Sequence, residues 1–145
     1  MTNNTTVLIT GGFDPIHSGH IAYIQSARRL GHRLVIGANS DEWLIRKKKK
    51  FFLPFVERKI ILESIKGVDL VIDFNDDDGS AKDAIRRVRE FYPNDDIVFA
   101  NGGDRNGKNI PEMDFKDERL FFIFGVGGDD KKNSSSWILE KWNKS

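Results

Sequence analysis

The chain has 145 residues, no cysteine and a formal net charge of +1. This length supports one domain with a substantial core, and 39% hydrophobic with 31% charged residues is typical of a globular protein. The near-zero net charge gives no general bias toward nucleic acids or membranes, and the absence of cysteine excludes disulfides, thiol catalysis and thiolate metal sites.

Short apolar runs alternate along the chain with stretches of helical periodicity. The expected strands are residues 7–10, 33–39, 69–74, 96–101 and 119–125. The expected helices are residues 21–30, 42–45, 55–65 and 80–92, and a last one that begins near 134–136. This alternation predicts an α/β fold for a single domain over residues 1–145, with a doubly wound, parallel five-stranded sheet and helices on both faces.

The segments that follow the expected strands are rich in glycine and polar residues. They read TGGFDPIHSGH, GANSD, FANGGDR and FGVGGDDKKNSSS. In open parallel sheets, ligands bind beyond the carboxyl ends of the strands, near the point where the strand order reverses. We therefore expect the functional residues in these four segments.

The first of these segments has the composition of a phosphate-binding turn. Gly11 and Gly12 let the backbone approach a ligand closely, and Gly19 removes a side chain where the next helix starts. Free N–H groups at that helix start attract an anion, and His17 and His20 add donors for phosphate oxygens that gain charge during transfer. The spacing matches neither G-x-G-x-x-G nor the Walker A pattern.

Two other interpretations of this segment are open. The simpler one is a turn followed by two surface histidines. The other is a metal pair, because positions i and i+3 share a helix face. A metal site would need further ligands, and His32 is the only other histidine in the sequence.

GGFDPIHSGH resembles the H-x-G-H signature of the cytidylyltransferase-like nucleotidyltransferases. These include glycerol-3-phosphate cytidylyltransferases, sugar- and heptose-phosphate nucleotidyltransferases and pantetheine-phosphate adenylyltransferases. NSDEW, ERKIILESIKGVDLVI, NGGDR and NSSSWIL recur in the order found in the glycerol-3-phosphate cytidylyltransferases, so the resemblance covers most of the chain. It implies a Rossmann-like α/β sandwich, in agreement with the strand–helix alternation.

The basic run RKKKK over residues 46–50 has several interpretations. Such a run is most often a solvated face or a surface loop, and it can also indicate a nucleic-acid patch, although no basic stripe continues it. The resemblance implies that its lysines bind the triphosphate and the acceptor phosphate. Lys47 and Lys49 are the closest matches, with Lys48 and Lys50 as the alternatives because the register could differ by one residue.

Two further motifs have a structural and a functional interpretation. NGGDR can be a simple strand-to-helix turn, but the resemblance implies that Gly103, Asp104 and Arg105 contact the nucleotide. In NSSSWIL one serine can be an N-cap, and three hydroxyls at a helix start also suit a phosphate. The family's arginine before this motif has no counterpart in register, so we expect Lys131 or Lys132 to supply a point charge. The predicted phosphate-binding residues of this motif are Lys132, Ser134, Ser135 and Ser136.

Other residues of unusual type are expected to be structural. The tryptophans Trp43, Trp137 and Trp142 are predicted as core or interface residues. His32 is predicted as a surface histidine, and Asp76–Asp78 as a solvated turn.

The resemblance implies transfer of a nucleoside monophosphate from a nucleoside triphosphate to a phosphorylated small molecule, with release of pyrophosphate. His17 and His20 would bind the triphosphate and stabilise the transition state, Lys47 and Lys49 would bridge the phosphates, and Asp14 would orient the donors or help to hold the metal. The other residues expected to bind the nucleotide in the first segment are Gly11, Gly12, Phe13 and Gly19.

The expected donor is CTP and the expected acceptor is glycerol 3-phosphate or another polyol or sugar phosphate. ATP with a heptose- or sugar-phosphate acceptor is the alternative. Mg²⁺ is expected to arrive with the triphosphate, and no protein metal site is predicted. A non-catalytic nucleotide-binding module and a metal-dependent phosphohydrolase are alternatives of other classes.

No nucleic-acid or membrane partner is expected. The amino-terminal MTNNTT lacks a signal-peptide pattern, and no apolar run has the length of a bilayer span, so a cytoplasmic protein is predicted. The resemblance further implies a homodimer.

Overall fold

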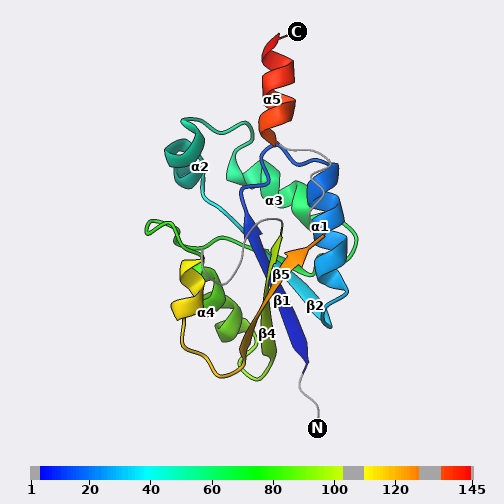
Figure 1. Cartoon of the computed structure of the whole chain (residues 1–145), viewed down its shortest axis with the longest axis vertical. Helices are drawn as coiled ribbons and strands as arrows, with labels where there is room; N and C mark the ends of the chain where they lie inside the picture. The colour runs from blue at the N-terminus through cyan, green and yellow to red at the C-terminus, as the bar shows by residue number, and fades with distance from the viewer. Residues whose placement is uncertain (1–3, 103–109, 128–134, 145) are drawn as a thin grey trace.

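The computed structural model describes residues 4–102, 110–127 and 135–144. Its centre is an all-parallel sheet of five strands in the order β3-β2-β1-β4-β5 (Figure 1). The strands are β1 (Thr5–Gly11), β2 (Arg33–Ala38), β3 (Leu70–Ile72), β4 (Asp96–Gly102) and β5 (Leu120–Val126). The predicted doubly wound, Rossmann-like parallel sheet is confirmed.

Helices cover both faces of the sheet, as the alternation in the sequence predicts. They are α1 (Ser18–Arg28), α2 (Asp41–Lys48), α3 (Phe55–Glu63), α4 (Lys82–Phe91) and α5 (Ser135–Lys144). Buried side chains of α1 and α3 pack on one face and those of α4 on the other. A short 3-10 helix, η1 (Pro111–Asp114), was not predicted. In Figure 1, α5 lies beyond the carboxyl ends of the strands.

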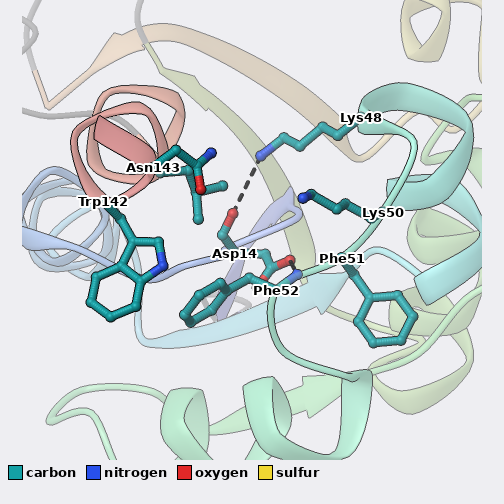
Figure 2. A pocket seen from close by; sticks show the side chains of 8 residues that line it. Asp14, Lys48, Lys50, Phe51, Phe52, Trp142 and Asn143 are labelled. Carbon is teal, nitrogen blue, oxygen red and sulfur yellow. Dashed lines mark hydrogen bonds between the residues drawn. The ribbon is translucent and has the colours of Figure 1, made fainter. Parts of the chain in front are cut away.

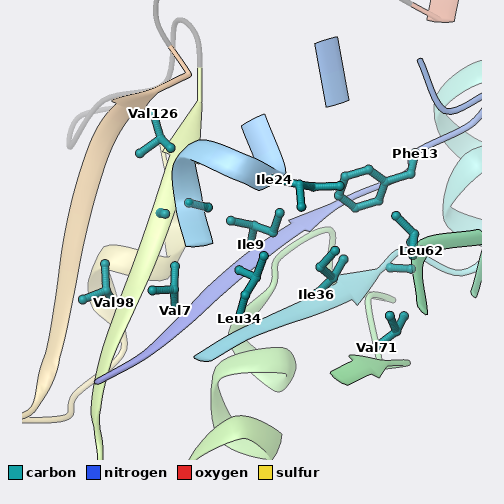
Figure 3. Close-up of a cluster of buried hydrophobic side chains, with 13 residues drawn as sticks. Val7, Ile9, Phe13, Ile24, Leu34, Ile36, Leu62, Val71, Val98 and Val126 are labelled. Carbon is teal, nitrogen blue, oxygen red and sulfur yellow. The ribbon is translucent and has the colours of Figure 1, made fainter. Parts of the chain in front are cut away.

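The core has two layers because successive strand residues point to opposite faces of a sheet. In β1, Val7 and Ile9 pack with Ile24 of α1 and Leu62 of α3 (Figure 3). Leu8, between them in the sequence, joins the layer beneath α4. The apolar runs of the strands are therefore buried on both faces, as expected for a parallel sheet.

The strand order reverses beside β1, and the sheet opens there. The β1–β4 pairing runs from Thr5–Asp96 to Leu8–Phe99, whereas the β1–β2 pairing continues to Gly11–Ala38. Helix α1 lies over the end of β4, where the Tyr23 hydroxyl donates a hydrogen bond of 2.6 Å to the Ala100 carbonyl. The segment after β1 therefore starts at the crevice where such folds bind ligands.

Among the described helices, none combines the length and the apolar composition that a membrane span requires.

Candidate functional site

The two neighbouring histidines form the cap of α1. His17 is the N-cap residue, and its Nδ1 accepts a hydrogen bond of 3.0 Å from the Gly19 backbone N–H. His20 reaches back, and its Nδ1 accepts one of 3.2 Å from the His17 backbone N–H. This reciprocal pair is a capping box, in which two N–H groups of the helix start are satisfied by side chains. The local backbone therefore fixes the position of both rings.

The same hydrogen bonds fix the tautomer of both rings. A nitrogen that accepts from a backbone N–H cannot carry a proton, so each neutral imidazole has its hydrogen on Nε2. The two rings are stacked, with centroids 3.9 Å apart and planes inclined by 28°. The start of α1 therefore presents two Nε2–H donors side by side.

His20 is held in its neutral form. Burial, and then the charges of His17 and Lys48, lower the pKa of His20 from 6.5 to about 4. Both charged neighbours act in the direction expected of nearby positive charge. At neutral pH the ring is therefore an uncharged donor beside a lysine.

The turn before the histidines is tightly packed. A Cβ atom on Gly12 would lie 2.8 Å from Leu44 Cδ2, so a side chain there would have to displace the buried Leu44 side chain. Phe13 is buried and has a φ of 52°, and its ring meets that of His20 edge to face at 5.1 Å. Phe13 therefore supports the ring of His20 from the core side.

Asp14 fastens the segment that follows the lysine run. It is 2% exposed, and its two carboxylate oxygens accept hydrogen bonds of 2.6 Å from the Phe52 N–H and 2.7 Å from the Leu53 N–H. Because both oxygens are engaged with backbone, the arrangement suits a residue that positions neighbouring groups.

The lysine run is split between different surroundings. Lys48 Nζ lies 3.3 Å from the Asp14 carbonyl oxygen, and burial lowers the pKa of this lysine. Lys47 Nζ lies over the Trp43 ring, 4.6 Å from its centroid. Lys49 ends α2 in the left-handed conformation with a φ of 74° and has an exposed side chain. The structure thus brings Lys48, rather than Lys49, to the histidines.

A cavity of about 300 Å³ lies between the lysine run and α5 (Figure 2). Lys48 and Lys50 reach into it from one side, and Trp142 and Asn143 come from α5 on the other. Trp142 is 72% exposed, so it is not a core residue, and the other predicted role, at an interface, stays a prediction. The cavity joins cationic and aromatic side chains next to Asp14, a combination suited to a nucleotide.

A second cavity, of about 170 Å³, lies at the carboxyl ends of β1 and β2. Lys47 and Trp43 line it from α2, and Glu112 lines it from η1. Glu112 is 2% exposed, and its Oε2 accepts a hydrogen bond of 2.8 Å from the Ala81 N–H. The other lining residues are Thr10, Gly11, Gly12, Asn39, Gly79, Ser80 and Ala81.

A buried arginine that the sequence analysis missed connects the loops of the site. Arg58 is 1% exposed, and its guanidinium donates to the carbonyl oxygens of Gly12, Asn39 and Leu53 and to the Asp41 carboxylate. The sequence could have revealed it, because Arg58 lies four residues before Leu62 and therefore on the same, buried face of α3.

Asp76, in the loop after β3, holds the loop that follows β2 in a similar way. It is 2% exposed and accepts hydrogen bonds from the Asn39 side chain and from the backbone and hydroxyl of Ser40. The prediction of a solvated turn is therefore wrong for Asp76, because the carboxylate is consumed in holding the neighbouring loop. Asp78 is exposed as predicted, and so is His32, at the opposite end of the sheet.

The predicted site residues in the second half of the chain lie partly in α5 and partly outside the described residues. Ser135 and Ser136 begin α5, within the predicted range for this helix start. The remaining ones lie outside the described residues, and they are Gly103, Asp104, Arg105, Lys132 and Ser134.

Residues 8–124 match the sequence model of the cytidylyltransferase-like family. The curated relatives include the bifunctional protein HldE of Edwardsiella ictaluri, which is 35% identical over 106 residues, or 72% of this chain and 20% of the relative. HldE of Photorhabdus laumondii is 32% identical over 127 residues, or 86% of this chain and 24% of the relative. The chain thus spans about a fifth to a quarter of the length of these relatives.

Solved structures share the fold at low sequence identity. A lipopolysaccharide core biosynthesis protein from Thermoplasma volcanium has a TM-score of 0.63 at 20% identity, covering 84% of this chain and 96% of that one. A bifunctional NMN adenylyltransferase/ADP ribose pyrophosphatase from Francisella tularensis, complexed with AMP and a manganese ion, has a TM-score of 0.65 at 20% identity, covering 99% of this chain and 43% of that one.

The family match covers most of the chain and includes both histidines, the lysine run and Arg58. The match and the geometry of the capped histidines agree with the resemblance seen in the sequence. The chain therefore belongs to the cytidylyltransferase-like family of nucleotidyltransferases.

Proposed function

We propose that this chain transfers AMP from ATP to a phosphorylated small molecule and releases pyrophosphate. One observation carries the proposal: His17 and His20 present two Nε2–H donors side by side, next to Lys48, at the crevice of the sheet. Donors held in place before a charge develops are the main means by which proteins accelerate phosphoryl-type transfer.

The proposed reaction is a single in-line displacement. An oxygen of the acceptor's phosphate forms a bond to the α-phosphorus of the triphosphate, and the bond from that phosphorus to the pyrophosphate oxygen breaks. The nucleophile is already an anion, so neither a general base nor a covalent enzyme intermediate is required. The protein contributes orientation and charge neutralisation.

Each group near the crevice has a distinct proposed task. The Nε2–H donors of His17 and His20 would stabilise charge on the α-phosphate and on the leaving pyrophosphate. Lys48 would lie between the donor and acceptor phosphates and offset their mutual repulsion. Asp14 would act through position alone, because its carboxylate holds the backbone of residues 52 and 53.

Mg²⁺ is proposed to arrive with the triphosphate. In the part of the chain that the structure describes, no group of three or more His, Asp or Glu side chains could hold an ion. These residues fit a Mg²⁺ that is held mainly by phosphate oxygens and water, as is usual for nucleotide-bound magnesium. When bound, it would neutralise part of the triphosphate charge.

Adenylyl transfer is favoured over the CTP reaction that the order of the motifs first indicated. One structural neighbour is titled an NMN adenylyltransferase and contains AMP. Another, from Vibrio parahaemolyticus, is titled a putative nicotinate-nucleotide adenylyltransferase, with a TM-score of 0.61 at 16% identity, covering 97% of this chain and 87% of that one. The two curated relatives described above are both HldE proteins. CTP remains the second candidate, because the H-x-G-H signature serves both nucleotides.

The experiment is pyrophosphate release by the full chain with Mg²⁺. ATP, CTP, GTP and UTP are each combined with glycerol 3-phosphate, ribitol 5-phosphate, glucose 1-phosphate and mannose 1-phosphate. We expect release above background only with ATP and at least one of these esters. His20→Ala is the inactive variant, and His32→Ala is the matched control, because His32 also accepts a backbone N–H through Nδ1 but lies at the other end of the sheet.

Three outcomes would contradict the proposal in different ways. The highest rate with CTP would return the assignment to a cytidylyltransferase. Nucleotide binding without release for any pair would favour a non-catalytic nucleotide-binding module. Release of inorganic phosphate that depends on a tightly retained transition metal would favour a phosphohydrolase.

A further inference from the structure

We propose that Tyr23 sets the spacing across the crevice of the sheet, so that one nucleoside triphosphate contacts the histidines of α1 and the ends of β4 and β5 together. Tyr23 is a positioning residue in this inference, because it acts through the backbone of β4. The inference rests on the proposed function, since it concerns how that nucleotide is held, but binding alone can test it.

Tyr23 holds β4 at the point where β1 no longer does. The β1–β4 pairing ends at Leu8–Phe99, and Ala100 is the next residue of β4. There the Tyr23 hydroxyl donates its hydrogen bond of 2.6 Å to the Ala100 carbonyl. Ala100 is 1% exposed, so water is a poor substitute for this donor. The side chain of Tyr23 therefore joins α1 to the far side of the crevice.

The same residue also lies against the last residues of both strands. A Cβ atom on Gly102, at the end of β4, would lie 3.2 Å from Tyr23 Cε1. A Cβ atom on Gly127, directly after β5, would lie 3.3 Å from Tyr23 Cα. The β4–β5 pairing changes register between Ala100 and Gly102, which is where Tyr23 is seated. Helix α1 is thus packed closely on the carboxyl ends of both strands.

Helix α1 carries the histidines on the other side of the crevice. His17 is its N-cap, and His20 lies three residues before Tyr23, on the same face of the helix. The backbone hydrogen bonds of a helix make one turn move as a unit. A displacement of Tyr23 relative to Ala100 would therefore displace the His20 ring as well. The hydrogen bond of Tyr23 fixes the distance from the Nε2–H donors to the ends of β4 and β5.

A fixed distance matters for a ligand that spans the crevice. In open parallel sheets, ligands lie across the point where the strand order reverses. The triphosphate would bind at the start of α1, and the nucleoside would lie toward β4 and β5. Two contacts of one ligand reinforce each other only when their spacing matches the ligand. Loosening the spacing should therefore weaken an intact nucleotide more than it weakens the phosphate chain alone.

The test compares an intact nucleotide with its phosphate chain. Titration calorimetry with Mg²⁺ and without acceptor measures binding of ATP, CTP and inorganic tripolyphosphate to the full chain and to Tyr23→Phe. Phenylalanine keeps the ring and removes only the hydroxyl. We expect the tighter of the two nucleotides to lose affinity at least about fivefold, the effect of one net hydrogen bond, and tripolyphosphate to lose less than about twofold.

The chain offers a matched control in its other tyrosine. Tyr92 follows α4, and its ring lies under the Arg33 guanidinium, 4.1 Å from the ring centroid. Tyr92→Phe keeps that ring and should change neither affinity. Equal losses for nucleotide and tripolyphosphate in Tyr23→Phe would indicate general loosening of the histidine turn and would overturn the inference. Unchanged nucleotide affinity, or no binding of tripolyphosphate to the wild type, would overturn it as well.

A second variant approaches the same contact from β4. Gly102→Ala keeps the Tyr23 hydroxyl but crowds its ring, so it should show the same selective loss of nucleotide affinity. Urea denaturation shows whether each variant is folded at the temperature of the titration. If Tyr23→Phe does not fold, Gly102→Ala decides the question, and an equal loss for both ligands would overturn the inference.

The outcome stays separable from the proposed function. If no nucleotide releases pyrophosphate with any ester, the transfer reaction fails, while the ratio of nucleotide to tripolyphosphate affinity still decides the role of Tyr23. If transfer occurs, Tyr23→Phe should raise the KM of the nucleotide and leave the KM of the ester unchanged. Transfer with an unchanged KM for the nucleotide would leave the reaction standing and overturn the inference.

Discussion

The two ends of the sheet use charged residues in different ways. At the carboxyl end, Arg58, Asp14 and Asp76 are each no more than 2% exposed and hydrogen-bond to backbone or side-chain groups of the neighbouring loops. At the amino end the charged side chains are more exposed: Arg119 and Asp96 pair with each other at 35% and 38% exposure, and Arg119 also donates to the Asn94 carbonyl oxygen. Buried charges must be fully satisfied, so the first kind fixes loop geometry, whereas solvent-exposed pairs contribute little.

The largest effect on stability is expected from removing one buried charge at the carboxyl end. Arg58→Met removes the cation that pairs with the Asp41 carboxylate and the donor to three carbonyl oxygens, so we expect the free energy of unfolding to fall by about 3–5 kcal/mol. Arg119→Met at the amino end should cost less than about 1 kcal/mol. Urea denaturation of both variants measures the difference, and similar losses would remove the contrast between the two ends.

The histidines allow the same comparison in activity. His17→Ala and His20→Ala should each lower kcat by at least about a hundredfold, the cost of one lost transition-state donor. His32→Ala should leave it unchanged. Loss of the cap should lower the free energy of unfolding by about 1 kcal/mol, so both variants stay folded. Near-normal turnover in either crevice variant would count against the proposed chemistry.

Acid should reveal the burial of His20. Its pKa is lowered to about 4 in the folded chain from an ordinary 6.5, so the unfolded chain binds the extra proton first as pH falls. Above pH 6.5 His20 is neutral in both states, and its burial does not lower the free energy of unfolding. Between pH 6.5 and pH 4 only the unfolded chain is protonated at this residue, so the free energy of unfolding falls by up to roughly 3 kcal/mol.

The measurement is the difference in unfolding free energy between the wild type and His20→Asn across this range. The subtraction cancels the pH dependence that comes from acidic groups with lowered pKa values, such as Asp78, Asp83 and Asp117. An imidazole signal of His20 that titrates near pH 6.5 in NMR would contradict the prediction.

The smallest expected effect on activity comes from the lysine run, and it shows which lysine of residues 46–50 contacts the phosphates. Lys48→Ala should lower kcat/KM by about tenfold, because a single charged contact is worth about 1.4 kcal/mol or more. Lys49→Ala, at an exposed position, should change it by less than about twofold. The reverse order would return the register to Lys47 and Lys49.

The elements of the fold were predictable because their signals are local. Apolar alternation and helical periodicity lie within each segment, and Ser40, a preferred capping residue directly before α2, is its N-cap. The histidine turn was also visible, since two imidazoles behind a glycine turn are unusual in a chain with three.

The rest of the site could not be predicted, because it is formed by contacts between distant segments or because the sequence does not show which lysine of the run is involved. A homopolymeric lysine run carries no internal periodicity, so the end of α2 at Lys48 decides which lysine meets Asp14. Glu112 reaches the cavity through a contact with Ala81, 31 residues away, and no local pattern marks it. Arg58 could have been found as a charge on an apolar helix face.

The cap of α1 also bears on how this sequence can change over generations. Serine, threonine, aspartate and asparagine are the preferred capping side chains, and imidazole is not among them. A replacement of His17 by one of these would keep or improve the helix while removing a donor from the crevice. Selection for a stable fold alone would therefore favour replacement of this histidine, whereas the proposed chemistry would require that it be kept.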